Sequence, residues 1–218
     1  MLLNITNGDY LNAKLSKEND GEFFPFREAM IQGFTCEKIF SDEFISLRAK
    51  SLGVSETDYK NYAKEILQFI SNHSTYKKLK LWFGKDTFCQ LNLLTLLALL
   101  EQINYLGEVE LVIIDDETGN ILSSPQTAKL GVYQNLYKTV IIERVMPNHF
   151  GVIDKRAIEL YFDYLSPNGY LANLIKQNSS LSGEELLLLI LENSKEYGLS
   201  DLNVKELILK TKNSNIKL

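Results

Sequence analysis

The most constraining feature of the sequence is a short apolar strand pattern that ends at a Gly-Lys-Asp turn and continues as an almost wholly apolar helix pattern. These three parts occupy residues 79–83, 84–86 and 87–100. A strand with apolar residues on both faces needs a layer of structure on each side, as in a parallel sheet. Ligands of such sheets bind beyond the carboxyl ends of the strands. The turn therefore marks the expected position of a binding site.

Strand and helix patterns alternate through the first half of the chain. The strand patterns occupy residues 2–6, 22–26, 79–83 and 109–114. This alternation predicts an α/β fold, a Rossmann-like three-layer sandwich with a mostly parallel sheet and right-handed crossovers. From residue 154 onward the periodicity is helical. We therefore expect an α/β domain over residues 1–125 and a mainly helical C-terminal domain over residues 126–218.

Polar residues predict where the helices begin. The expected N-caps are Asp9, Ser41, Ser55, Asp86 and Ser182, the last in a capping box with Glu185. The helix from Ser55 should run to about residue 70, and residues 140–142 fit either a strand or a buried turn of helix. In the helix after Asp86, polar residues are confined to one narrow stripe, Asn92, Thr95 and Gln102. That helix should therefore be deeply packed.

Composition excludes several classes of protein. The formal net charge of −5 over 218 residues argues against a broad nucleic-acid footprint, which requires clustered Lys and Arg. Cys36 and Cys89 do not have the spacing of a metal or redox motif, and such separated cysteines are typical of reduced thiols in the cytosol. Residues 1–6 lack the pattern of a signal peptide, and the leucine run 91–100 is too short to span a bilayer. We expect a cytoplasmic protein without a membrane partner.

Three polar clusters follow predicted strands: residues 7–9, 84–86 and 115–116. In a parallel sheet they would share one edge, where glycines allow close backbone approach and helix N-termini favour anions. These clusters predict a pocket for a small anionic ligand, nucleotide-like or phosphorylated. The candidate ligand-binding residues are Asn7, Gly8, Asp9, Gly84, Lys85 and Asp86, with Arg27 and Arg48 as further contributors.

The same residues also have a structural interpretation, in which the aspartates cap helices, the glycines form turns and Lys85 is solvated. Metal-assisted hydrolysis by Asp9, Asp86 and Asp115 is a further alternative, but capping explains these residues with fewer assumptions, and we predict no metal site. The sequence contains no P-loop, dinucleotide GxGxxG, GxSxG or HExxH motif. It therefore identifies no reaction, catalytic residue or cofactor.

A second hypothesis assigns the function to the C-terminal helices. Two helix patterns, over residues 184–197 and 203–210, have the spacing of a helix-turn-helix and are followed by a basic chain end. The basic residues are Lys205, Lys210, Lys212 and Lys217. On this reading the protein is a non-enzymatic regulatory module that contacts a protein or nucleic acid. A homo-oligomeric scaffold is the third reading.

Several of these segments resemble a bacterial family catalogued as domain of unknown function 1835. The matching pieces are residues 3–9, 26–28 with Gly33, 47–49, and 81–86 with Gln90 and Leu91. The chain departs from the family pattern where Phe26 replaces tryptophan, Glu28 replaces aspartate and Phe34 replaces proline. The resemblance covers residues 2–115, with a weaker likeness to a helical extension at residues 161–168 and 197–200. It implies the α/β architecture and no activity.

Overall fold

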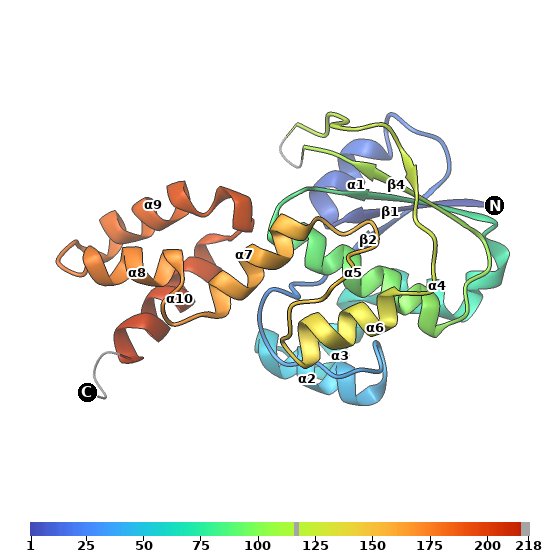
Figure 1. Ribbon diagram of the computed structural model, residues 1–218. Coiled ribbons are helices and arrows are strands. Elements are labelled where there is room, and N and C mark those ends of the chain that lie inside the picture. Colours follow the sequence, from blue (N-terminus) through green and yellow to red (C-terminus); the bar gives the residue numbers. More distant parts are fainter. Residues whose placement is uncertain (116–117, 215–218) are drawn as a thin grey trace.

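The computed structural model describes residues 1–115 and 118–214, and its centre is a five-stranded sheet in the order β2-β1-β3-β4-β5 (Figure 1). The strands are β1 (Leu2–Asn7), β2 (Glu22–Phe26), β3 (Lys78–Phe83), β4 (Glu108–Ile113) and β5 (Gln126–Thr127). The first four are parallel, and β5 pairs with β4 in the antiparallel direction. The expected α/β fold, with a mostly parallel sheet and a helical C-terminal region, is confirmed.

Helices cover both faces of the sheet. On one face, Leu11 and Leu15 of α1 (Asp9–Leu15) pack with Trp82 of β3, Val112 of β4 and Ile114, the residue after β4. The other face carries the larger core and most of the helices. These helices are α2 (Asp42–Leu52), α3 (Glu56–Tyr62), α4 (Lys64–Asn72), the 3-10 turn η1 (His73–Thr75), α5 (Thr87–Gln102), α6 (Tyr133–Tyr137) and the π-helix η2 (Lys138–Ile142).

Helix α5 is the centre of the second layer. Every residue from 91 to 100 has no exposed surface, which confirms the expected deep packing. Two polar residues of this helix bond to the connection between β2 and α2. The Asn92 amide donates to the Glu28 carbonyl (2.6 Å) and accepts from the Met30 N–H (3.1 Å), and Gln102 bonds to both backbone groups of Ile39. The polar stripe thus anchors a connection that has no regular structure.

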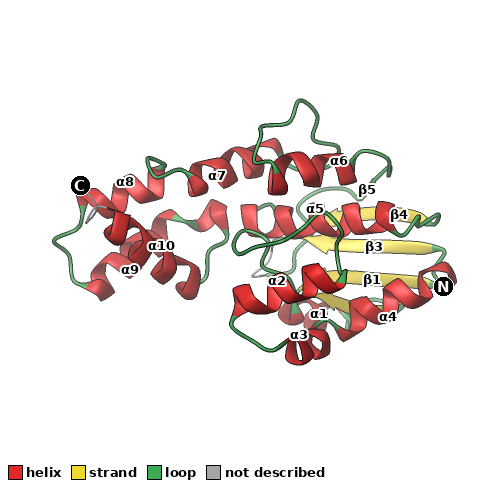
Figure 2. Cartoon of the chain, turned by 90° about the horizontal axis from the view of Figure 1, so that it is seen from below, coloured by secondary structure: helices red, strands yellow, loops and turns green. Residues whose placement is uncertain are grey.

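The C-terminal helices form a second core. Helix α7 (Lys155–Leu165) leads from the sandwich to α8 (Tyr170–Gln177), α9 (Gly183–Asn193), the 3-10 turn η3 (Lys195–Tyr197) and α10 (Asp201–Ser214). The strand β3 points toward this region (Figure 2). The hydroxyl of Thr87, the first residue of α5, lies 3.2 Å from the carbonyl oxygen of Ala157 and 3.3 Å from that of Glu196. The carboxyl edge of the sheet therefore faces the C-terminal helices.

The hydrophobic cores show where the two parts of the chain separate. The core of the sandwich continues beyond residue 125, because it includes residues of α6 and η2 and also Tyr161 of α7. The second core begins at Leu160 and extends to Ile208. Helix α7 therefore contributes to both.

Most expected helix starts are confirmed, since Ser41, Ser55, Asp86 and Ser182 accept capping hydrogen bonds. The prediction for Asp9 was wrong, because Gly8 is the N-cap of α1. Gly8 has φ of 85°, a conformation that favours glycine. The Asp9 side chain therefore does not cap α1.

Two other segments differ in detail from expectation. The helix expected from Ser55 divides at Ala63 into α3 and α4, and residues 140–142 belong to the π-helix η2. Within the described part of the chain, no helix combines the length and the apolar character needed to cross a membrane.

Candidate functional site

The polar ends of β1 and β3 lie side by side at the carboxyl edge of the sheet. The two strands are parallel neighbours, with Ile5 opposite Leu81 and Thr6 opposite Trp82. Strand β4 follows on the other side of β3 in the same direction. This edge therefore brings together the segments that carry Asn7, Asp86 and Asp115; Asp116 lies outside the described residues.

The residues after β1 have bonds within the protein. The Asn7 amide donates to the Cys89 sulfur (2.8 Å) and accepts from Asn92 (2.9 Å). The Gly8 N–H donates to the Phe26 carbonyl of β2 (3.1 Å). Both residues thus tie the end of β1 to its neighbours.

The turn after β3 is partly covered by the C-terminal helices. Asp86 accepts from the Cys89 N–H (2.9 Å) and caps α5, and the Gly84 carbonyl accepts from Gln90 (2.6 Å). A side chain at Gly198 would collide with the Asp86 carboxylate, so the turn after η3 lies directly against the cap. Lys85 is exposed. Gly84 and Asp86 therefore form a turn and a helix cap, as the structural interpretation of the sequence expects, and Lys85 is exposed to solvent.

Arg27 uses all its hydrogen-bond donors within the protein. Its guanidinium lies between Asp9, at 2.8 Å, and Glu65, and it also donates to the Tyr62 carbonyl (2.7 Å). Arginine has five N–H groups, and here the Nε and both Nη atoms are each directed at these acceptors. No N–H of Arg27 remains for a ligand.

Arg48 has donors to spare. The side chain is 1% exposed and forms an ion pair with Glu28, from Nε to Oε2, at 3.0 Å. Each Nη atom donates once, to the carbonyls of Gln32 (2.7 Å) and Ala29 (2.9 Å). Three of the five N–H groups therefore have acceptors among the described residues, and two do not.

Arg48 lines a cavity of about 320 Å³, here called the arginine cavity. It is enclosed by the connection after β2, by α2, by the end of η2 and by α7. Its polar lining residues are Gln32, Thr35, Arg48, Arg144 and Tyr161. No acidic side chain lines it, and Arg144 makes no ion pair among the described residues. The cavity is therefore positively charged.

Tyr161 presents a hydroxyl group to this cavity. The side chain is 4% exposed and packs in the main core, and its hydroxyl has no hydrogen-bond partner among the described residues. Burial raises the pKa of Tyr161, and the charges of Arg144 and Arg48 oppose that rise. The phenol is therefore a neutral donor close to both arginines.

Gln32 is the second polar group at the cavity without a partner. Its Oε1 is fully buried and forms no hydrogen bond with any described residue. A buried polar atom without a partner costs about 1–3 kcal/mol, so such atoms commonly mark functional positions. The next residue, Gly33, has φ of 85°, and a Cβ there would lie 2.8 Å from Arg48 Nη1. Glycine thus lets the backbone pass close to the guanidinium.

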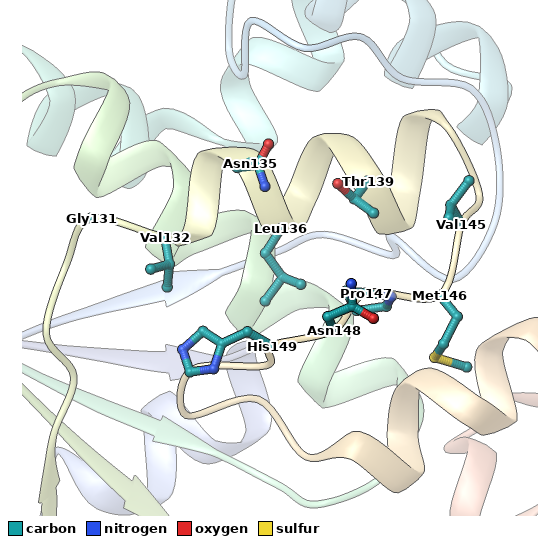
Figure 3. Close-up of a pocket in the computed structure, with 10 residues that line it drawn as sticks. All are labelled: Gly131, Val132, Asn135, Leu136, Thr139, Val145, Met146, Pro147, Asn148 and His149. Atoms are coloured by element: carbon teal, nitrogen blue, oxygen red, sulfur yellow. The ribbon is translucent and has the colours of Figure 1, made fainter.

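A different cavity, of about 430 Å³, lies between α6, η2 and the following loop (Figure 3). Its ten lining residues are mostly apolar or neutral, with Leu136, Val145 and Met146 among them. His149 is the one titratable side chain in this lining. This cavity lacks the convergent charged groups that orient a small ligand, so the arginine cavity is the better candidate for a ligand-binding site.

The three aspartates considered for metal chemistry have other partners. Asp9 pairs with Arg27, Asp86 caps α5, and Asp115 accepts from the N–H and hydroxyl of Thr118 (both 2.7 Å). Among the described residues, no group of three or more His, Cys, Asp or Glu side chains is arranged to hold a metal ion.

Sequence reasoning named Arg48 but missed its partners. Glu28 was noted only as a departure from a family pattern, and Gln32, Arg144 and Tyr161 were not proposed as ligand-binding residues. Arg144 has a positive φ of 56°, which a sequence does not reveal. The one available signal was a buried-looking arginine in a helix, which requires a carboxylate elsewhere in the chain.

The fold and the cavity together define an α/β protein with a positively charged cavity beside the carboxyl edge of a parallel sheet. No protein-family model, curated protein or solved structure matches the chain. The resemblance to domain of unknown function 1835 therefore stays a prediction.

Proposed function

We propose that the protein binds a small anionic ligand, nucleotide-like or otherwise phosphorylated, in the arginine cavity. The observation that carries this proposal is the pair of unused N–H donors on the buried Arg48, beside the unpaired Arg144. Guanidinium groups bind phosphate oxygens through two parallel hydrogen bonds. Tyr161 adds a neutral donor, and the volume of about 320 Å³ is that of a small-molecule site.

The proposed site differs from the one that the sequence predicted at residues 7–9 and 84–86, although both are at the carboxyl edge of the sheet. Of the eight residues that the sequence singled out, Arg48 is the one that lines the arginine cavity. Asn7, Gly84 and Asp86 support the edge instead, through the bonds described above.

Thermal unfolding in the presence of inorganic phosphate, pyrophosphate and nucleoside phosphates tests the proposal. A ligand at a hundred times its dissociation constant should stabilise the protein by about 2.7 kcal/mol. Arg144→Gln should weaken binding at least about tenfold, because a hydrogen bond to a charged group contributes about 1.5–3 kcal/mol. Tyr161→Phe should weaken it less, since only the hydroxyl is removed.

Two matched variants distinguish the cavity from the rest of the surface. Arg156→Gln removes an exposed arginine of α7, and Lys85→Ala removes the exposed cation of the Gly-Lys-Asp turn. Both should bind as the wild type does. The proposal is wrong if no phosphorylated compound stabilises the protein, or if Arg144→Gln binds as tightly as Arg156→Gln.

A further inference from the structure

A third cavity, of about 430 Å³ and here called the aromatic cavity, has Glu28 of the Glu28–Arg48 ion pair in its wall. It is enclosed by the end of β2, by α3 and by the first turn of α5. Its wall includes Tyr59, Tyr62 and Phe88, with Leu52 and Val54 beside them. Glu28 belongs to this wall, whereas Arg48 belongs to the wall of the arginine cavity.

The charges around the aromatic cavity are predominantly negative. Glu28 and Asp58 line it, and the third charged lining residue, Arg27, lies between Asp9 and Glu65. With Arg48 as the partner of Glu28 and Lys64 as a second partner of Glu65, four carboxylates are set against three cations, a formal excess of one negative charge. An anion is therefore disfavoured here, in contrast to the arginine cavity.

The aromatic rings provide the apolar part of a cation site. The Tyr62 ring already stabilises a cation, since the Arg27 guanidinium lies 5.4 Å from its centroid. Tyr59 is fully buried and donates its hydroxyl to Glu28, which fixes the carboxylate at the cavity wall. Aromatic rings attract cations through their quadrupoles, and cages of such rings bind quaternary ammonium groups.

We infer that the aromatic cavity binds a small organic cation, with its charge on an alkylated nitrogen, between the rings of Tyr62 and Phe88 and the carboxylates of Glu28 and Asp58. The inference does not depend on the anion site, because the two cavities have separate walls and opposite charge. Leu52 and Val54 line the same cavity, so the methyl groups on the nitrogen of such a ligand would lie close to them.

Choline is a suitable probe, and its neutral carbon isostere 3,3-dimethylbutan-1-ol is the control. The methyl NMR signals of Leu52 and Val54 report directly on the cavity in the intact chain. Choline should shift these signals in a saturable way at millimolar concentrations. The alcohol, which has the same shape without the charge, should shift them several-fold more weakly. Equal affinity of the two compounds, or no shift with choline, would overturn the inference.

Variants of the wall test which groups bind. Tyr62→Leu and Asp58→Asn should each weaken choline binding about twofold to fivefold, the effect of one exposed cation–π or charge contact. Tyr170→Leu and Asp201→Asn change an equally exposed tyrosine and an acidic first-turn residue on other helices, and they should leave choline binding unchanged. An unaltered affinity in both wall variants contradicts the inference, whatever the result with phosphate.

Discussion

Arg27 lies between the carboxylates of Asp9 and Glu65, whereas Arg48 has one carboxylate partner, Glu28. The difference decides what each arginine can do. Arg27 fixes the end of β2 to α1 and α4 and has no donor left. Arg48 is held in place by Glu28 and two carbonyls, has two N–H groups without an acceptor among the described residues, and lines the arginine cavity.

The buried ion pair should contribute to stability only as a pair. Arg48→Met leaves the Glu28 carboxylate buried without its cation, so we expect a loss of about 3–5 kcal/mol in the free energy of unfolding. Glu28→Gln should lower the free energy of unfolding by a similar amount, because it leaves the Arg48 guanidinium buried without its carboxylate partner. The double variant should lose less than the sum of the single losses, as measured by urea unfolding. Strict additivity would contradict a direct coupling between the two side chains.

Glu65 should make stability depend on acid pH. Burial raises the pKa of this carboxyl, but the hydrogen bond and charge of Arg27 outweigh burial and lower the pKa below 4.5. A lowered pKa stabilises the folded state above the unfolded value and loses that effect as the pH falls through the folded value. The free energy of unfolding should therefore fall less in Glu65→Gln than in the wild type as the pH is lowered below 4.5. Glu192→Gln, in α9, should retain the full wild-type fall.

Helix α5 is the element that holds the site together. Its apolar residues form the core, and its polar residues Asn92 and Gln102 hold the connection that leads to Arg48. The sequence predicted the burial of this helix, because polar residues were confined to a single stripe. It could not predict what the stripe binds, since the connection over residues 27–41 has no periodicity of its own.

Removal of the Asn92 amide should loosen this connection. Asn92→Ala leaves the Met30 N–H and the Glu28 carbonyl without their partner, so the free energy of unfolding should fall by at least about 2 kcal/mol. Thr95→Ala is the matched control, because the Thr95 hydroxyl bonds only to Leu91 in its own helix. Urea unfolding of the two variants measures the difference. Equal losses would show that α5 does not support the connection through Asn92.

At the scale of the whole molecule, the C-terminal helices contact the sandwich where the end of η3 meets the first turn of α5. Gly198 has φ of 67° and lies against Asp86. Gly198→Ala should therefore destabilise the protein by about 1 kcal/mol or more in thermal unfolding. Gly183→Ala is the control, because its position in α9 has open space for a side chain, and it should be neutral or slightly stabilising. Equal melting temperatures of the Gly198→Ala and Gly183→Ala variants would mean that the contact between Gly198 and Asp86 does not contribute to stability.

For the whole molecule, the sequence predicts the arrangement of the strands but not the position of the cavities. Alternating strand and helix patterns lead to a parallel sheet through rules that hold for most chains. The arginine cavity requires Arg48 of α2, Arg144 of the loop after η2 and Tyr161 of α7 to converge from three separate segments. Such convergence depends on packing angles that residue patterns do not encode.

The two outer strands of the sheet have a consequence for contact between copies of the chain. Strand β2 forms one border of the sheet, and its Phe26 carbonyl accepts from the Gly8 N–H on the inner side. Backbone groups of successive residues in a strand alternate between the two sides, so the backbone nitrogen of the neighbouring Pro25 is on the outer side. Proline has no N–H, and this border therefore lacks a donor that an intruding strand would need. The opposite border, β5, has only two residues. Both borders are therefore poor templates for strand pairing between copies of the chain.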